Sequence, residues 1–177
     1  MSKILTIDYE TSDSRVNFGQ VLQAGIVISD DKLNIQSRHE LRCRLKPTVI
    51  PSIGACLVHK IPVNILKNSN KSHYEMVLEH YNLIKDNTPS VVMGFNQVAF
   101  DIEFYRRMLY KSLIPDVYQT NTNGNRHLDI LNVSRAAKFA DNDSIQTILN
   151  EKNRDSFKLA DLSTANKINN GTSHDAI

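Results

Sequence analysis

The stretch SVVMGFNQVAFD, residues 90–101, places a short apolar run directly before a helical pattern. Residues 90–95 are mostly apolar and end at Asn96, as expected of a strand inside a sheet. Apolar residues then recur at helical intervals over residues 100–113, before Pro115. A strand joined to a helix by a tight connection is typical of α/β proteins. We therefore predict an α/β fold.

The segments on either side of this stretch supply further strands and helices. Residues 3–9 are β-branched and apolar, which predicts a buried strand. Two more predicted strands, residues 20–28 and 33–45, flank a turn at Asp30 and Asp31 and complete an antiparallel meander. The segment that contains Pro47, Pro51 and Pro62 is expected to form a loop region, and so are residues 116–125. Periodicity predicts further helices over residues 74–87, 128–139 and 158–167.

Length and composition restrict the class of protein. A chain of 177 residues, 41% hydrophobic and 23% charged, can form one domain with its own core and is neither disordered nor collagenous. Its 21 basic and 19 acidic side chains permit a polyanionic partner without requiring one. No apolar run approaches a membrane span of about 20 residues. We expect a cytoplasmic protein without a membrane partner, in which Cys43 and Cys56 are reduced.

Two carboxylates stand at the end of the first predicted strand. Because side chains alternate along a strand, Asp8 and Glu10 point to one face and Tyr9 to the other. Two like charges held together are unfavourable unless a cation neutralises them, and hard oxygen ligands suit Mg²⁺ or Mn²⁺. An exposed pair of acids at a strand end is the alternative interpretation.

Two further features extend this constellation. Asp101 falls in the first turn of a predicted helix, where the helix dipole also favours a carboxylate. Sites in α/β sheets collect at the carboxyl ends of strands, so Asp8, Glu10 and Asp101 are expected to converge. His174, in SHDA at residues 173–176, is either a surface residue or a base.

The order of these motifs resembles a known family. DYET at residues 8–11, GFNQVAFD at 94–101 and SHDA at 173–176 are similar to the DEDD exonuclease superfamily in its histidine-containing (DEDDh) branch, and most to the bacterial exodeoxyribonuclease I family. The intervening segments GACLVHKI (54–61), RHLD (126–129) and SFKL (156–159) match as well. The resemblance implies an RNase H-like mixed β-sheet flanked by α-helices.

The same resemblance implies an activity and a cofactor. The activity is 3′ to 5′ hydrolysis of single-stranded DNA, which releases 5′-mononucleotides in DNA repair and recombination. The cofactor is a pair of Mg²⁺ ions, for which Mn²⁺ can substitute. The resemblance also implies a monomer whose partners are single-stranded DNA and a single-stranded DNA-binding protein. Two metal ions about 3.5–4 Å apart can activate the attacking oxygen and stabilise the leaving one.

Residue roles follow from the same resemblance. Asp8 is expected to bridge the ions, Glu10 to complete one shell and orient the terminal nucleotide, and Asp101 to hold the second ion. His174 is expected to take the proton of the attacking water, for which an unperturbed pKa of about 6.5 is suitable.

Further residues are expected to bind the substrate. Lys158 stands where the family has an arginine, which keeps the charge and loses the bidentate fork, and Arg106 and Arg135 match other basic positions. A solvated helix face is the alternative for each. Leu57 and His59 are expected near the 3′ nucleotide, with a core position as the alternative for Leu57.

The chain departs from the family at one position. The family's fourth carboxylate, five residues after the histidine, would fall two residues beyond Ile177. We therefore expect residues 1–177 to form an exonuclease domain without its last helix and without the family's SH3-like and helical domains, and with weakened metal binding. A related proofreading exonuclease, an exoribonuclease, or a catalytically silent module that binds single strands remain as alternatives.

Overall fold

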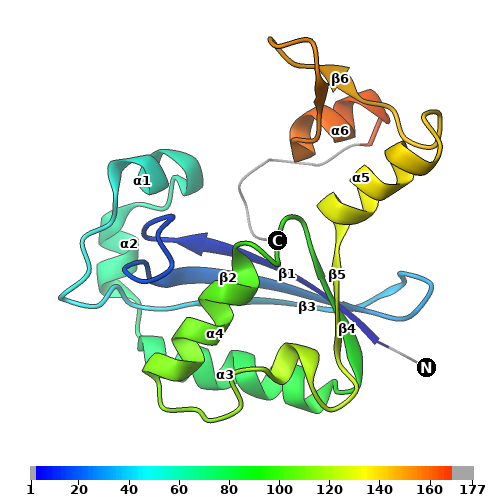
Figure 1. Ribbon diagram of the computed structural model, residues 1–177. Helices are drawn as coiled ribbons and strands as arrows, with labels where there is room; N and C mark the ends of the chain where they lie inside the picture. The colour runs from blue at the N-terminus through cyan, green and yellow to red at the C-terminus, as the bar shows by residue number, and fades with distance from the viewer. Residues whose placement is uncertain (1–2, 169–177) are drawn as a thin grey trace.

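A five-stranded mixed sheet forms the centre of the computed structural model, which describes residues 3–168 (Figure 1). The strands lie in the order β3-β2-β1-β4-β5. The first three strands pair antiparallel, whereas β4 is parallel to β1 and β5 is parallel to β4. The strand bounds are β1 (Lys3–Thr11), β2 (Val21–Ser29), β3 (Ile35–Arg42), β4 (Ser90–Gly94) and β5 (Arg126–Asp129). The predicted meander and the mixed α/β sheet are confirmed.

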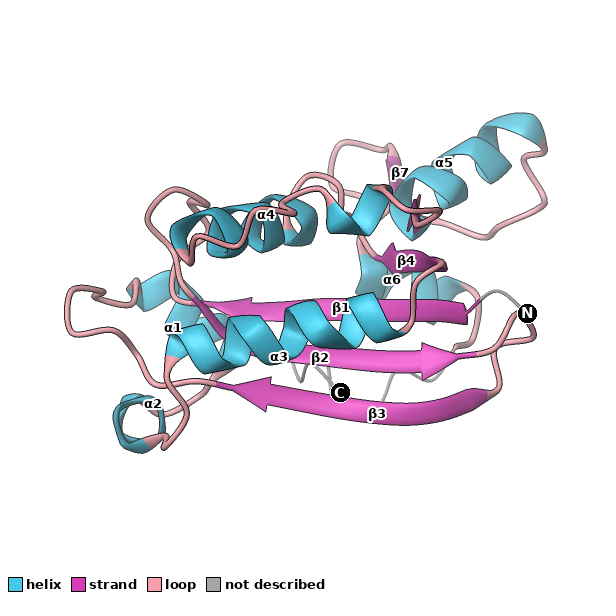
Figure 2. Ribbon diagram, turned by 90° about the horizontal axis from the view of Figure 1, so that it is seen from below, coloured by secondary structure: helices cyan, strands magenta, loops and turns pink. Residues whose placement is uncertain are grey.

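Helices flank this sheet. Figure 2 shows α3 covering the sheet and running roughly along its strands, and Figure 1 shows α1 and α2 near the end at which β1 points. A two-stranded hairpin, α5 and α6 lie beyond β5 (Figure 1). The bounds are α1 (Ile53–His59), α2 (Val63–Asn68), α3 (His73–Asp86), α4 (Asp101–Lys111), η1 (Gln119–Asn121), α5 (Ile130–Ala140), β6 (Ile148–Leu149), β7 (Asp155–Ser156) and α6 (Leu159–Ala165).

The main core lies between the sheet and the helices α3 and α4. Alternate residues of β1 are buried, namely Leu5, Ile7 and Tyr9, while Asp8 between them is exposed. They pack in one cluster with Met76 of α3 and other apolar side chains of α3 and α4. Each fully buried apolar side chain of this size contributes roughly 1.5–3 kcal/mol. The alternation therefore fixes which face of β1 carries its acids.

A buried polar contact fixes the end of β1 to both helices. The Tyr9 hydroxyl lies 2.8 Å from Nε2 of His80 in α3, and the His80 ring lies 4.8 Å from the ring of Tyr105 in α4. Burial lowers the pKa of His80 to about 3, so the ring is neutral at physiological pH. The contact fixes Tyr9, which lies between Asp8 and Glu10, on the core face of the sheet.

Two sequence predictions of local structure were wrong. The proline-punctuated loop region contains the helices α1 and α2, and α1 begins with the Ser52 hydroxyl accepting from the Ala55 N–H at 3.1 Å. The predicted helix over residues 128–139 begins later, because residues 126–129 form β5 and Asp129 caps α5. Both features are too short for a periodic pattern to show. Within residues 3–168, no helix is long and apolar enough to cross a bilayer, and Cys43 and Cys56 are free thiols.

Candidate active site

The carboxyl ends of three strands meet at one edge of the sheet. Since β1, β4 and β5 are mutually parallel, Glu10, Gly94 and Asp129 all lie at this edge. The connection that leaves β4 leads directly to Asp101, the first residue of α4. Ligand sites in such sheets form outside the carboxyl ends of the strands. The predicted acids are therefore on elements that end at the same edge.

Asp101 is buried against the end of β1. Its side chain is 5% exposed, and the backbone N–H groups of Asp101 and Tyr9 form hydrogen bonds to its carboxyl group. Burial, and next the nearby charge of Asp8, raise the pKa of Asp101 to about 8, against the opposing effect of those hydrogen bonds. The structure thus brings Asp101 and Asp8 into electrostatic contact, although they are far apart in the sequence.

Glu10 lies two residues beyond Asp8 on the same strand. Its side chain is buried at 8% exposure, whereas Asp8 is exposed, and the pairing of β1 with β2 becomes irregular just after Glu10. Tyr9 faces the core, as strand alternation predicts. Among the predicted carboxylates, two are therefore buried and one is open to solvent.

The donor atoms fit a hard divalent cation. Oδ1 of Asp101 is buried and has no hydrogen-bond partner among the residues that the structure describes, an arrangement that is costly unless a cation satisfies the oxygen. Asp8 and Glu10 supply further oxygen donors, which Mg²⁺ and Mn²⁺ prefer. Over residues 3–168, no three His, Cys, Asp or Glu side chains are already gathered as a metal cluster. His174 lies outside the described residues, so its predicted role stays a prediction.

Asp129 holds the connection that carries Asp101, a function that the sequence did not reveal. Its Oδ1 accepts from the N–H of Asn96 at 2.9 Å and from the N–H of Leu131 at 3.0 Å, and its Oδ2 accepts from Val98 at 3.2 Å. Asn96 adopts a left-handed conformation with φ of 58°. One carboxylate therefore fixes both the start of α5 and the path of the β4–α4 connection.

Close packing beneath this connection leaves little freedom. Gln97 is fully buried, and its Nε2 donates to the carbonyls of Val92 at 2.8 Å and Leu128 at 3.1 Å. A Cβ atom at Gly94 would lie 2.9 Å from the Ile7 carbonyl oxygen and 3.0 Å from Cβ of Gln97. Gly94 thus permits the close approach of β4, β1 and the connection that precedes Asp101.

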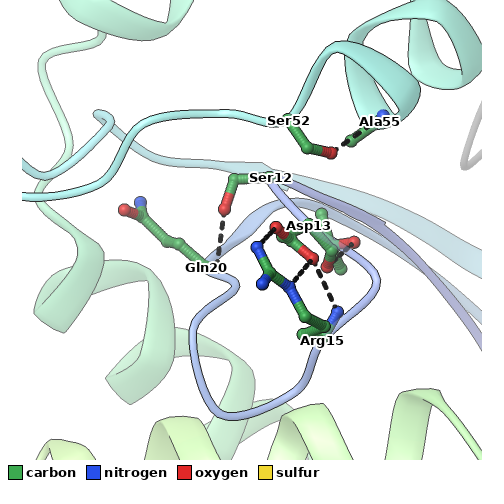
Figure 3. A network of polar contacts seen from close by, with 7 residues as sticks. Ser12, Asp13, Arg15, Gln20, Ser52 and Ala55 are labelled. Atoms are coloured by element: carbon green, nitrogen blue, oxygen red, sulfur yellow. Dashed lines mark hydrogen bonds and ion pairs between the residues drawn. The ribbon is translucent and has the colours of Figure 1, made fainter.

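The segment after β1 positions α1 beside the carboxylates. Ser12 Oγ accepts from the Gln20 N–H at 2.9 Å (Figure 3). The Ser12 N–H donates to the Gln20 carbonyl at 2.9 Å, and the Ser52 N–H donates to the Ser12 carbonyl at 2.8 Å. Leu57 of α1 is 72% exposed, so it is not a core residue. His59 is buried, with Nδ1 accepting from the Ile61 N–H at 2.9 Å.

The predicted basic residues have different surroundings. Arg106 pairs with Glu103 at 2.7 Å and lies 5.0 Å over the Tyr118 ring, so its guanidinium already has partners within the chain. Arg135 of α5 lies 5.9 Å over the ring of Phe157, the residue before the exposed Lys158. Arg135 and Lys158 therefore belong to one part of the surface, formed by α5 and the start of α6.

The chain is similar in sequence to curated exonucleases. It is 28% identical over 174 residues to exodeoxyribonuclease I of Buchnera aphidicola subsp. Acyrthosiphon pisum and 25% identical over 177 residues to exodeoxyribonuclease I of Escherichia coli K12. These alignments cover 98% and 99% of the chain but 42% and 37% of the relatives. The chain thus spans less than half the length of these relatives. No protein-family model matches it.

Solved structures share the fold. The structure of E. coli exonuclease I in complex with a dT13 oligonucleotide matches 99% of the chain and 38% of its own chain, with a TM-score of 0.92 at 25% identity. The ExoI/SSB-Ct complex matches with a TM-score of 0.90 at 24% identity. The RNase H-like fold predicted from the sequence is thereby confirmed.

Proposed function

We propose that the chain is the exonuclease domain of a 3′ to 5′ exodeoxyribonuclease that acts on single-stranded DNA. Support comes from its similarity to exodeoxyribonuclease I over almost the whole length of this chain. The observation that carries this proposal is the burial of Asp101 beside Asp8 at the carboxyl edge of the sheet, with an unpartnered carboxylate oxygen. A buried acid paired with a second acid is unfavourable for the fold by itself, which favours a functional role.

Asp8, Glu10 and Asp101 would hold the divalent cations, two Mg²⁺ ions for which Mn²⁺ can substitute. Their oxygens are the donor type that these ions prefer. When bound, the cations supply Lewis-acid stabilisation of the negative charge on the phosphodiester. Asp129 and Gln97 would keep Asp101 in place during turnover by fixing the β4–α4 connection. His174 would accept the proton of the attacking water.

The strand would contact the protein on two sides of the carboxylates. Leu57 presents exposed apolar surface on α1, which is anchored to the end of β1 through Ser12 and Ser52. This position suits contact with the terminal base. Arg135 and Lys158 would bind backbone phosphates, with Phe157 supporting the Arg135 guanidinium. Arg106 would contribute less, because Glu103 already neutralises it.

Single-stranded DNA and SSB are the proposed partners, in DNA repair. Support comes from related structures, in which E. coli exonuclease I is bound to a dT13 oligonucleotide and ExoI is bound to SSB-Ct. A repair role would follow from removal of single strands from their 3′ ends.

Shortening of a labelled oligonucleotide tests the proposal. A 5′-labelled single-stranded DNA should yield a ladder of shorter products with Mg²⁺, and Asp8→Ala should abolish it. Asp31→Ala is the matched control. Asp31 is an exposed acid that follows β2, at the sheet edge opposite to the one that carries the carboxylates, so its replacement should leave the ladder unchanged. Equal shortening of RNA would instead support an exoribonuclease. Binding without shortening would contradict the enzyme and support a silent binding module.

A further inference from the structure

A small cavity lies beside the main core, along the part of α4 that follows Asp101. Its volume is about 50 Å³, and its walls come from the segment between β1 and β2, the residues after β3, and the helices α3 and α4. The polar side chains that line it include Lys46, His73, Arg107 and Lys111, and no Asp or Glu is among the lining residues. The cavity therefore concentrates positive charge without an internal counter-charge.

The three cations at this cavity have few protein partners within the described residues, although Arg107 and Lys111 are also exposed to solvent. Neither Lys46 nor Arg107 makes a side-chain hydrogen bond or ion pair with any residue in the described range 3–168, and Lys111 donates only to the Asn17 carbonyl, at 2.9 Å. Burial, and then the charges of Lys46 and Arg107, lower the pKa of Lys111. The groups are thus close enough to repel one another, and an anion would relieve that repulsion.

His73 supplies a buried donor at the same place. Its side chain is 6% exposed and lines the cavity, and within the described part of the chain its ring makes no hydrogen bond. The ring nitrogens of His73 are not among the fully enclosed polar atoms that lack a partner, so solvent reaches them, and a ligand in the cavity can replace that water. His73 is also the first residue of the 14-residue helix α3, whose N-terminus carries partial positive charge. Burial and the charges of Lys46 and Lys111 lower the pKa of His73 to about 4, so the ring is neutral at pH 7.

We propose that this cavity binds a phosphate group through Lys46, His73, Arg107 and Lys111. Guanidinium and ammonium groups form charge-assisted hydrogen bonds with phosphate oxygens. A water molecule needs about 10–15 Å³ of such space, so the cavity has room for a small oxyanion. The phosphate could be inorganic phosphate, the phosphate of a mononucleotide, or a phosphodiester of a DNA strand.

This site is distinct from the proposed catalytic carboxylates. Lys111 lies ten residues after Asp101 on α4, which corresponds to roughly 15 Å along the helix axis. Phosphate binding there needs neither a divalent cation nor nuclease activity. The proposal can therefore be tested, and can fail, independently of the proposed function.

Thermal unfolding of the full chain in EDTA tests the proposal. Inorganic phosphate should raise Tm saturably above a sodium chloride control of equal ionic strength, because a ligand that binds only the folded state stabilises it. The variant R107M/K111M should weaken the apparent affinity about tenfold or more, by the loss of charge-assisted bonds. The matched control Lys85→Met, an exposed lysine near the other end of α3, should leave the affinity unchanged. Phosphate stabilisation that is no larger than that of chloride, or equal in R107M/K111M, would overturn the proposal.

An NMR titration of the wild-type chain avoids any folding defect of the variant. The imidazole nitrogen signals of His73 should shift with phosphate and stay fixed with chloride, and unmoved signals would overturn the proposal. Parallel titrations with dTMP and with an oligothymidylate that lacks terminal phosphates distinguish the sources. A His73 shift with dTMP supports a site for a phosphate monoester, and a shift with the oligothymidylate supports a site for a phosphodiester.

Discussion

Replacement of Asp129 tests whether the β4–α4 connection depends on one carboxylate. Asp129→Ala removes three hydrogen bonds to backbone N–H groups, those of Asn96, Val98 and Leu131. Hydrogen bonds to a charged group contribute about 1.5–3 kcal/mol each, and an N-cap about 1 kcal/mol, so loss of the bonds to Asn96 and Val98 and of the cap should cost about 4–7 kcal/mol. Asp129→Asn keeps one acceptor oxygen and turns an N–H donor toward Val98, so about half of that loss is expected.

Urea unfolding and the Mg²⁺ dependence of DNA shortening measure the two consequences. Asp141→Ala is the control, because Asp141 ends the same helix, is exposed, and its carboxylate accepts a single hydrogen bond within residues 3–168, from the Asp143 N–H at 3.0 Å. It should cost about 0.5–1 kcal/mol. If Asp129 positions Asp101, Asp129→Asn should also raise the Mg²⁺ concentration for half-maximal activity severalfold. Equal unfolding free energies for the Asp129→Ala and Asp141→Ala variants would refute the reasoning.

Three further predictions concern buried groups near the sheet edge. The carboxyl pKa of Asp101 is raised from 3.8 to about 8, so in EDTA the folded state loses stability as pH rises from about 4 to 8. In urea unfolding, the unfolding free energy of Asp101→Asn should exceed that of wild type by about 2 kcal/mol at pH 5 and by up to about 6 kcal/mol above pH 8. The His80 pKa is lowered from 6.5 to about 3, so wild type should lose up to about 5 kcal/mol relative to His80→Gln between pH 7 and 3, and a pH-independent difference would contradict this. Gly94→Ala should destabilise by about 1–3 kcal/mol through its contact with the Ile7 carbonyl, whereas Gly54→Ala, with open space around it, should not destabilise.

The sequence predicted the sheet edge well because strand alternation is a strong signal. A nine-residue strand such as β1 fixes the directions of Asp8 and Glu10, and the helical pattern after β4 places Asp101 at a helix start. Parallel strands that end at one edge then bring Asp8 near Asp101, whereas a cluster of all three acids stays a prediction, because no three such side chains are gathered over residues 3–168. The proximity of Asp8 and Asp101 could therefore be predicted from the strand topology alone.

Other features were not predictable from periodicity. The strand β5 has four residues and α2 has six, which is less than the length over which a pattern repeats. The contacts of Asp129 with Asn96 and Val98 depend on where two loops meet in space. The ion pair that reduces the availability of Arg106 had a local signal, since Glu103 is three residues earlier on the same helix.

Binding of Mn²⁺ to the purified chain tests the metal site most directly. Mn²⁺ is a hard cation that oxygen ligands accept in place of Mg²⁺, and the EPR signal of its free form reports binding. The account predicts saturable Mn²⁺ binding by wild type in the presence of a single-stranded oligonucleotide, with a large loss of affinity in both Asp8→Asn and Asp101→Asn and none in Asp31→Asn. Equal Mn²⁺ affinity in all four proteins would contradict it.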